Sequence, residues 1–424
     1  MPRLFTGLLT AIFLAARSAQ GQPLPLTLDQ VIDEAVSRNL GLLAERFNIS
    51  ISEARIIQAR LRPNPVLSLG GNYLDILGSG FNPSTNAAGP TEVNARVDYI
   101  LERGSKRQER IAVAEASKAV SQLELLNSTR NLLLDVRSAF TDLLLAKENA
   151  ALARASLEAF DQIVAVNKTR ADAGDLARVE LVRSEVAQLQ FSNQVRQTES
   201  RVRLARHRLQ ALMGRLVFDP AFDVSGQLRR DPLVSAKSEL TSMALSARPD
   251  LDALRRDQAR SQAELRLQLA QGKVDYTVGA AVNRQFGVRG LASGNSVGVF
   301  FSLPLPVYNK NQGEIERAKR EQEQILARIR NLEQQIQAEV ENAFEQQQTA
   351  RQLLDRIEAD LLDRAKRVRE VTDFSYRRGE ATFVELLDAQ RTYNETMQGY
   401  NEARAEYGRA MFLIDAITGK GLSQ

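Results

Sequence analysis

Residues 93–100 read VNARVDYI, and apolar and polar side chains alternate along them. Residues 66–74, VLSLGGNYL, show the same kind of alternation. Successive side chains of a β-strand point to opposite faces, so both segments are expected to be strands with one apolar face. Gly, Asn, Ser and Pro fill residues 78–90 between them, and these residue types are typical of loops. We therefore predict a β-hairpin over residues 66–101.

The second half of the chain repeats this pattern. Val274, Tyr276 and Val278 begin one alternating segment, and residues 297–305 place apolar side chains at every second position. A loop-like segment separates the two, which predicts a second hairpin over residues 273–305. Strands of about ten residues with one apolar face suit a tilted crossing of a bilayer.

Helical patterning surrounds each hairpin. Long stretches without proline follow the hairpins, at residues 105–168 and 312–377, and they are rich in helix-forming Ala, Leu, Glu, Gln and Arg. Apolar residues in the second stretch recur at steps of three and four, which indicates coiled-coil-like packing. Helices are also predicted before the hairpins, over residues 28–61 and 239–271, the latter interrupted near Pro249.

The two halves are copies of one pattern. Residues 174–214 align with residues 379–419 at a constant offset, so that Glu180 matches Glu385. Glycine at the start of each segment predicts a turn that reverses the long helix into a shorter return helix.

These patterns divide the chain into five parts. Residues 1–21 are expected to be a secretory signal peptide, because Arg3 is followed by an apolar run and then by small residues. Each repeat holds a helix, a hairpin, a long helix and a return helix. The first repeat covers residues 22–214, a linker or equatorial region covers 215–237, the second repeat covers 238–419, and residues 420–424 form a C-terminal tail.

Composition argues against several functions. With 56 basic and 52 acidic residues, the net charge of +4 gives no polybasic surface, so nucleic acid is not an expected partner. Cysteine is absent and His207 is the one histidine, whereas transition-metal sites need clustered soft or imidazole ligands. No nucleophile–base constellation or phosphate-binding glycine loop is found either. We predict no catalytic, cofactor or metal site, and no enzyme.

Four strands per chain have a consequence for assembly. They cannot close a barrel, and an open sheet edge in lipid leaves backbone groups unsatisfied at several kcal/mol each. Several copies must then share one barrel, and cyclic assembly lets the last strand of one protomer pair with the first strand of the next. These arguments leave the number of copies open.

Three stretches resemble the TolC family of outer-membrane efflux proteins, and the resemblance spans residues 27–419. They are ARLRPNPVLSLGG at 59–71, SLPLPVYNKNQGEIERA at 302–318, and YRRGEATFVELLDAQRTYNETMQGYNEARAEYGRA at 376–410. The resemblance implies a homotrimer whose 12-stranded transmembrane β-barrel, four strands per protomer, continues as a long α-helical barrel in the periplasm. The stretch at 302–318 is most similar to the branch that serves heavy-metal cation efflux.

The resemblance also implies a function. The protein would be the outer-membrane exit channel of a tripartite efflux pump, a passive gated conduit that receives metal cations or small toxic compounds. Its partners would be outer-membrane lipid, a periplasmic adaptor protein and an inner-membrane RND-type transporter. Type I protein secretion uses the same architecture and stays an alternative. A secreted coiled-coil structural protein is an alternative of another class, but it does not explain the duplicated hairpins.

Two acidic residues are candidates for the periplasmic aperture. Glu385 and Asp388 are three positions apart and therefore lie on one helix face. The resemblance implies that three copies of each form two acidic rings that attract cations. Composition by itself favours a solvated helix face instead. Tyr376 matches a family residue that locks the tip, and Glu180 is expected to belong to the same gate. Ala381, by contrast, stands where well-known members carry a gate-bonding arginine.

The turns at residues 170–176 and 376–382 would form the periplasmic tips. Helix reversal alone explains a glycine in each turn. The resemblance implies that the tips also dock the adaptor, through Arg170, Gly174, Leu176, Arg378, Gly379 and Thr382.

Overall fold

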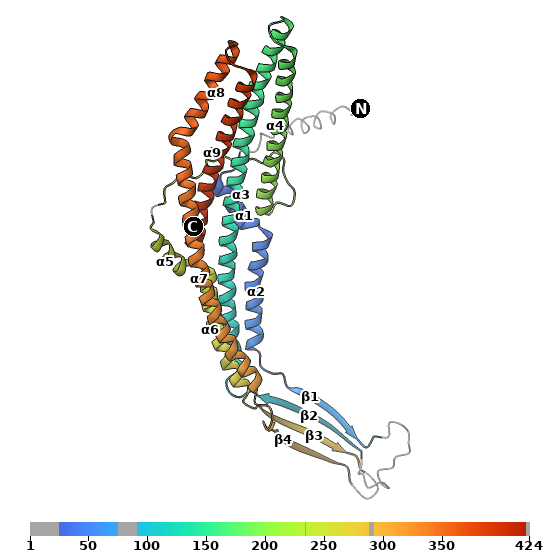
Figure 1. Ribbon diagram of the computed structural model, residues 1–424. Coiled ribbons are helices and arrows are strands. Elements are labelled where there is room, and N and C mark those ends of the chain that lie inside the picture. The colour runs from blue at the N-terminus through green and yellow to red at the C-terminus, as the bar shows by residue number, and fades with distance from the viewer. Residues whose placement is uncertain (1–24, 75–90, 234, 288–291, 421–424) are drawn as a thin grey trace, which may run out of the picture. The chain divides into compact units, whose positions relative to one another are not determined.

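The computed structural model describes residues 25–74, 91–233, 235–287 and 292–420 (Figure 1). The expected signal peptide, the whole loop at 78–90 and the last four residues of the tail lie outside the described residues. The elements in chain order are α1 (Leu28–Arg38), α2 (Leu40–Arg60), β1 (Val66–Asn72), β2 (Glu92–Leu101), α3 (Lys106–Asp172), α4 (Arg178–Leu212), α5 (Lys237–Ala247), α6 (Pro249–Gln271), β3 (Tyr276–Gln285), β4 (Gly294–Ser302), α7 (Gln312–Arg356), the π-helix η1 (Ile357–Leu361), α8 (Leu362–Arg377) and α9 (Phe383–Ile417).

The four strands form one antiparallel sheet in the order β1-β2-β3-β4. Both expected hairpins are present, and β2 pairs with β3, so the sheet joins the two repeats. The expected extension of the last strand to Leu303 and Leu305 is wrong, since β4 ends at Ser302. Prolines at 304 and 306 have no backbone N–H to donate to a ladder, which explains the early end.

One face of this sheet is apolar and the other is largely polar. Leu67, Val97, Ala280 and Val299 lie opposite one another in one row across the four strands. The adjacent row points to the other face and consists of Ser68, Arg96, Ala281 and Gly298. The apolar face is open in the single chain, where Val299 is 85% exposed.

The prediction of a single helix over residues 28–61 is wrong, because Asn39 interrupts the helix between α1 and α2. The Asn39 side chain accepts a hydrogen bond from the Leu42 backbone N–H and donates one to the Leu212 carbonyl, both at 2.9 Å. Asparagine is a favoured helix N-cap, so this side chain stabilises the start of a new helix. In the second repeat α5 and α6 meet at Pro249, as predicted.

The two long helices differ. The first, α3, is a continuous α-helix of 67 residues. The second was also expected to be continuous, but the π-helical turn η1 of five residues interrupts it between α7 and α8. Within η1, Glu358 accepts a hydrogen bond from the Tyr400 hydroxyl at 3.0 Å and pairs with Arg230. Such short π-helical insertions are a known departure from α-helical geometry.

The chain divides into two compact units, and each takes segments from both sequence repeats. The first comprises the described residues within 1–45, 125–249 and 333–424, and the second comprises those within 46–124 and 250–332. In the first unit α1, α3 and α4 share a core with residues 222–228, around Val31, Phe140 and Leu209. No described helix combines the length and the apolar character that crossing a membrane requires.

Candidate functional site

The first helix reversal lies between α3 and α4. Gly174 has φ +85°, a conformation that residues with a side chain rarely adopt. The Asp175 backbone N–H donates to the Arg170 carbonyl at 2.8 Å, which satisfies one of the last carbonyls of α3. Apart from the residues adjacent to it in the chain, no described residue has an atom within 4 Å of a Cβ built at Gly174, so backbone conformation and not space calls for glycine here.

The second reversal, between α8 and α9, has the same construction. Gly379 has φ +79°, and the Glu380 backbone N–H donates to the Ser375 carbonyl at 2.9 Å. Both turns predicted from the repeated glycines are therefore present in the structure.

An apolar cluster lies beneath these turns. Phe160 is fully buried at its centre, and its ring centroid is 4.4 Å from that of Phe191 and 6.4 Å from that of Phe383. Figure 1 shows the contributing helices as two pairs, α3 with α4 and α8 with α9. The buried members of the cluster are Phe160, Ile163, Ala187, Tyr376, Phe383 and Leu386.

Tyr376 links α8 to α3. Its ring is buried in the cluster, and its hydroxyl donates a hydrogen bond of 2.7 Å to Oδ1 of Asn167. Burial raises the pKa of Tyr376, so the hydroxyl remains a neutral donor at physiological pH. Asn167 is itself fully buried, and its Nδ2 has no hydrogen-bond partner among the described residues. Sequence reasoning missed Asn167, although its spacing of seven from Phe160 places it on the buried face of α3.

Glu385 and Thr382 form a capping box at the start of α9. The Thr382 hydroxyl accepts from the Glu385 backbone N–H, and the Glu385 carboxylate accepts from the Thr382 backbone N–H at 2.7 Å and from its hydroxyl at 2.9 Å. These bonds from Thr382 lower the pKa of Glu385, which keeps the exposed carboxylate charged. The T-x-x-E pattern in the sequence is the signal that could have revealed this pairing.

The other candidate residues have varied surroundings. Asp388 is exposed one turn after Glu385 and has no hydrogen bond or ion pair within the described part of the chain. Glu180 pairs with Arg183 at 2.7 Å. The Arg378 guanidinium lies 4.2 Å above the centre of the Phe374 ring.

Arg170 and Leu176 are half-buried beside the first turn. The two turns thus carry charged side chains above a shared apolar cluster. Over the described residues, no three His, Cys, Asp or Glu side chains gather closely enough to hold a metal ion.

Comparison with known proteins identifies the family. The sequence profile of a family described as outer membrane efflux protein matches residues 31–215 and 240–420. The chain belongs to the outer membrane efflux protein family. This outer membrane efflux protein is therefore a passive channel of the outer membrane with a large periplasmic helical part, and not an enzyme, as predicted. The two matched ranges also confirm the internal repeat.

Individual relatives agree with this assignment. The cobalt-zinc-cadmium resistance protein CzcC of Cupriavidus metallidurans is 25% identical over 401 residues, which cover 93% of this chain and 90% of CzcC. The CmeC outer membrane channel of Campylobacter jejuni has a TM-score of 0.78 at 15% identity, over 93% of this chain and 86% of CmeC. The open state of the MtrE channel of Neisseria gonorrhoeae has a TM-score of 0.73 at 18% identity, over 93% and 89% of the two chains. The protomer thus has the predicted TolC-like fold.

Proposed function

We propose that three copies of this outer membrane efflux protein form one channel, the exit duct of a tripartite pump that exports metal cations. The observation that carries the proposal is the four-stranded sheet, whose edge strands β1 and β4 each pair on one side only with the strands that the structure describes. An unpaired edge in lipid costs several kcal/mol per backbone group, and cyclic pairing of β4 with β1 of the next copy removes it. Three sheets of four strands make a barrel of twelve.

The helices at the edges of the first unit support the same assembly. Figure 1 shows α4 and α8 as the outer members of the four tip helices. Each carries exposed apolar residues at helical spacing, and burying such a stripe against a neighbouring helix is favourable. The stripe on α4 consists of Val179, Val182, Val186 and Leu189, and that on α8 of Val368, Val371 and Phe374.

Substitution within the α4 stripe tests the trimer. Val186→Glu places a charge in the proposed contact, and we expect loss of the heat-modifiable trimer from outer-membrane fractions. Val186→Leu is the matched control, because it keeps the surface apolar and should leave the trimer intact. A membrane-inserted monomer of the wild-type protein would refute the proposed assembly.

We further propose that Glu385 and Asp388 line the periplasmic aperture as two acidic rings, with Tyr376 and Glu180 in the gate. Both acids are exposed on one side of α9, and the lowered pKa of Glu385 keeps its ring charged. Closely spaced carboxylates retain cations. The double variant Glu385→Gln, Asp388→Asn should therefore lower cation-over-anion selectivity and weaken block by multivalent cations in planar bilayers.

This double variant should keep its structure, since glutamine also serves in a capping box. Asp363→Asn is a suitable control, because it removes an exposed carboxylate from α8. If Glu385 and Asp388 lie on a solvated outer face, salt screens them over about 8 Å and the double variant will match the wild type.

The tips are proposed to dock the periplasmic adaptor, and a cysteine-free chain allows a clean test. Single variants Leu176→Cys and Thr382→Cys should cross-link to an adaptor in cells. Leu126→Cys, at an exposed position of α3, should not. Equal cross-linking from all three positions would refute docking at the tips.

The cargo is proposed from CzcC, whose name records cobalt, zinc and cadmium resistance. Deletion of the gene should sensitise cells to these cations, and the wild-type gene should restore growth. Sensitivity to organic toxic compounds alone, or loss of a secreted protein, would instead indicate drug export or type I secretion.

A further inference from the structure

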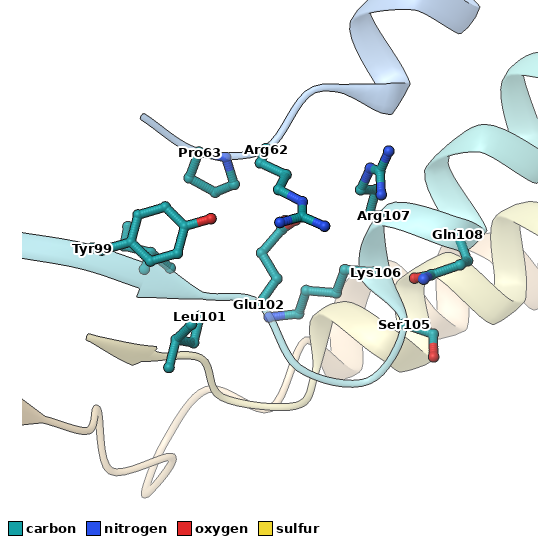
Figure 2. A pocket seen from close by; sticks show the side chains of 10 residues that line it. Arg62, Pro63, Tyr99, Leu101, Glu102, Ser105, Lys106, Arg107 and Gln108 are labelled. Atoms are coloured by element: carbon teal, nitrogen blue, oxygen red, sulfur yellow. The ribbon is translucent and has the colours of Figure 1, made fainter. Parts of the chain in front are cut away.

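A cavity lies at the end of β2, where the chain enters α3 (Figure 2). Its volume is about 260 Å³, and its lining comes from residues 62–63, 99–102 and 105–108. All of these residues belong to the second compact unit. Pockets for drug-sized ligands measure roughly 300–1,000 Å³, so this cavity suits a smaller group.

Two of the charged residues in the lining are already paired. The Glu102 carboxylate accepts two hydrogen bonds from Arg110, one of them at 3.0 Å. Lys106 is buried, and its Nζ lies 2.7 Å from the Asp275 carboxylate. These pairs hold the start of α3 against the strands. The charge in the cavity lining that they do not neutralise comes from two arginines.

Arg62 and Arg107 supply that remaining positive charge. Arg62 is exposed and has no hydrogen bond or ion pair within the described residues. Nε of Arg107 donates to the Arg60 carbonyl at 2.6 Å, which positions the guanidinium without neutralising it. Guanidinium groups bind phosphate through paired hydrogen bonds, and the backbone N–H groups at the start of α3 add partial positive charge.

The cavity adjoins the end of the apolar sheet face. Tyr99 lines it and lies opposite Val278 on that face. Tyr276 is on the same face, with the Arg103 guanidinium 4.5 Å above its ring centre. Tyrosines gather at the boundary between hydrocarbon and water in barrels that cross membranes. Figure 2 shows the Tyr99 hydroxyl and the Arg62 guanidinium directed toward a common space.

We propose that this cavity binds the phosphate of an anionic phospholipid headgroup and so fixes each chain at the depth of the headgroups. The inference rests on the proposed insertion of the sheet into the membrane. Arg62 and Arg107 bind the phosphate oxygens, and the Tyr99 hydroxyl donates a further hydrogen bond.

Native mass spectrometry of the full-length protein in detergent tests the site, with phosphatidylglycerol, phosphatidylcholine and inorganic phosphate as separate probes. The wild type should retain one phosphatidylglycerol per chain in preference to phosphatidylcholine. Arg62→Gln with Arg107→Gln should weaken that binding at least about tenfold, since each lost charge-assisted contact contributes substantially. The control, Arg328→Gln with Arg330→Gln, removes the same charge from exposed positions of α7 and should bind as the wild type does.

Three results would overturn the site: equal binding by the double variant and the wild type, equal retention of the two lipids, or saturation by inorganic phosphate without preference for lipid. Conductance in planar bilayers separates this inference from the proposed function. The double variant should still conduct. A wild type that binds phosphatidylglycerol but never conducts would refute the channel and leave the lipid site standing.

Discussion

Replacing Tyr376 by phenylalanine removes one hydroxyl group from the apolar cluster beneath the two turns. The ring, whose centroid lies 6.2 Å from that of Phe383 within the apolar cluster, stays in place, so no cavity forms. What is lost is the hydrogen bond of 2.7 Å to Asn167. Because Nδ2 of Asn167 already has no partner in the described part of the chain, the variant leaves the whole amide buried and unsatisfied there.

The size of the effect follows from that burial. An unsatisfied buried polar group costs about 1–3 kcal/mol, which corresponds to roughly 5–150-fold in the local opening equilibrium. Replacing Asn167 by leucine as well removes the orphaned amide, so the double variant Tyr376→Phe, Asn167→Leu should recover much of the loss. The tips should therefore open more often in the single variant than in the double variant.

Hydrogen exchange of the full-length protein measures this directly. Amides of residues 160–172 and 370–390 should exchange faster in Tyr376→Phe, while the core of the first unit keeps its protection. Tyr393→Phe is the control, because the Tyr393 hydroxyl makes no hydrogen bond within the described residues and Arg369 contacts only its ring. Unchanged exchange in Tyr376→Phe, or an equal loss of protection in Tyr393→Phe, would refute the reasoning.

Four further substitutions probe the local structure. Thr382→Ala should destabilise the first turn of α9 by about 1 kcal/mol, seen as faster exchange of its amides, and normal exchange there would contradict the capping box. Gly174→Ala should lower the free energy of unfolding by about 1–2 kcal/mol, because alanine is strained at this positive φ. Gly214→Ala should be more damaging and reduce the yield of folded protein, because its Cβ would lie 2.3 Å from a backbone carbonyl oxygen. The hydrogen bond from Arg215 lowers the pKa of Glu34 in the folded protein. Their pair therefore stabilises the fold fully above the unfolded-state pKa of about 4.3. This stabilisation is lost as the pH falls through the lower pKa of the folded state. Thermal unfolding should therefore show Glu34→Gln less stable than the wild type by about 1 kcal/mol at pH 7, with the difference vanishing toward pH 3.

The sequence predicts several local features of the site. Both turns follow from the repeated glycines at 174 and 379, since only glycine readily adopts their positive φ. The acidic pair at 385 and 388 follows from helical periodicity. The break at Asn39 could not be predicted with the same ease, because asparagine also occurs inside helices and only its bond to Leu212, far along the chain, shows what it does.

The sequence by itself determined where the four strands and the main helical stretches lie, though not every boundary. It also determined that the pattern occurs twice and that each hairpin has one apolar face. These properties depend on side-chain periodicity and local backbone preference, which neighbouring residues fully specify. Only the tertiary structure decided that β2 pairs with β3, that Tyr376 meets Asn167, and that Arg62 and Arg107 line one cavity. The residues in each of these pairs are 45 or more positions apart (107 − 62 = 45 for the two arginines). Their meeting depends on how whole elements pack, a long-range outcome that periodicity does not encode.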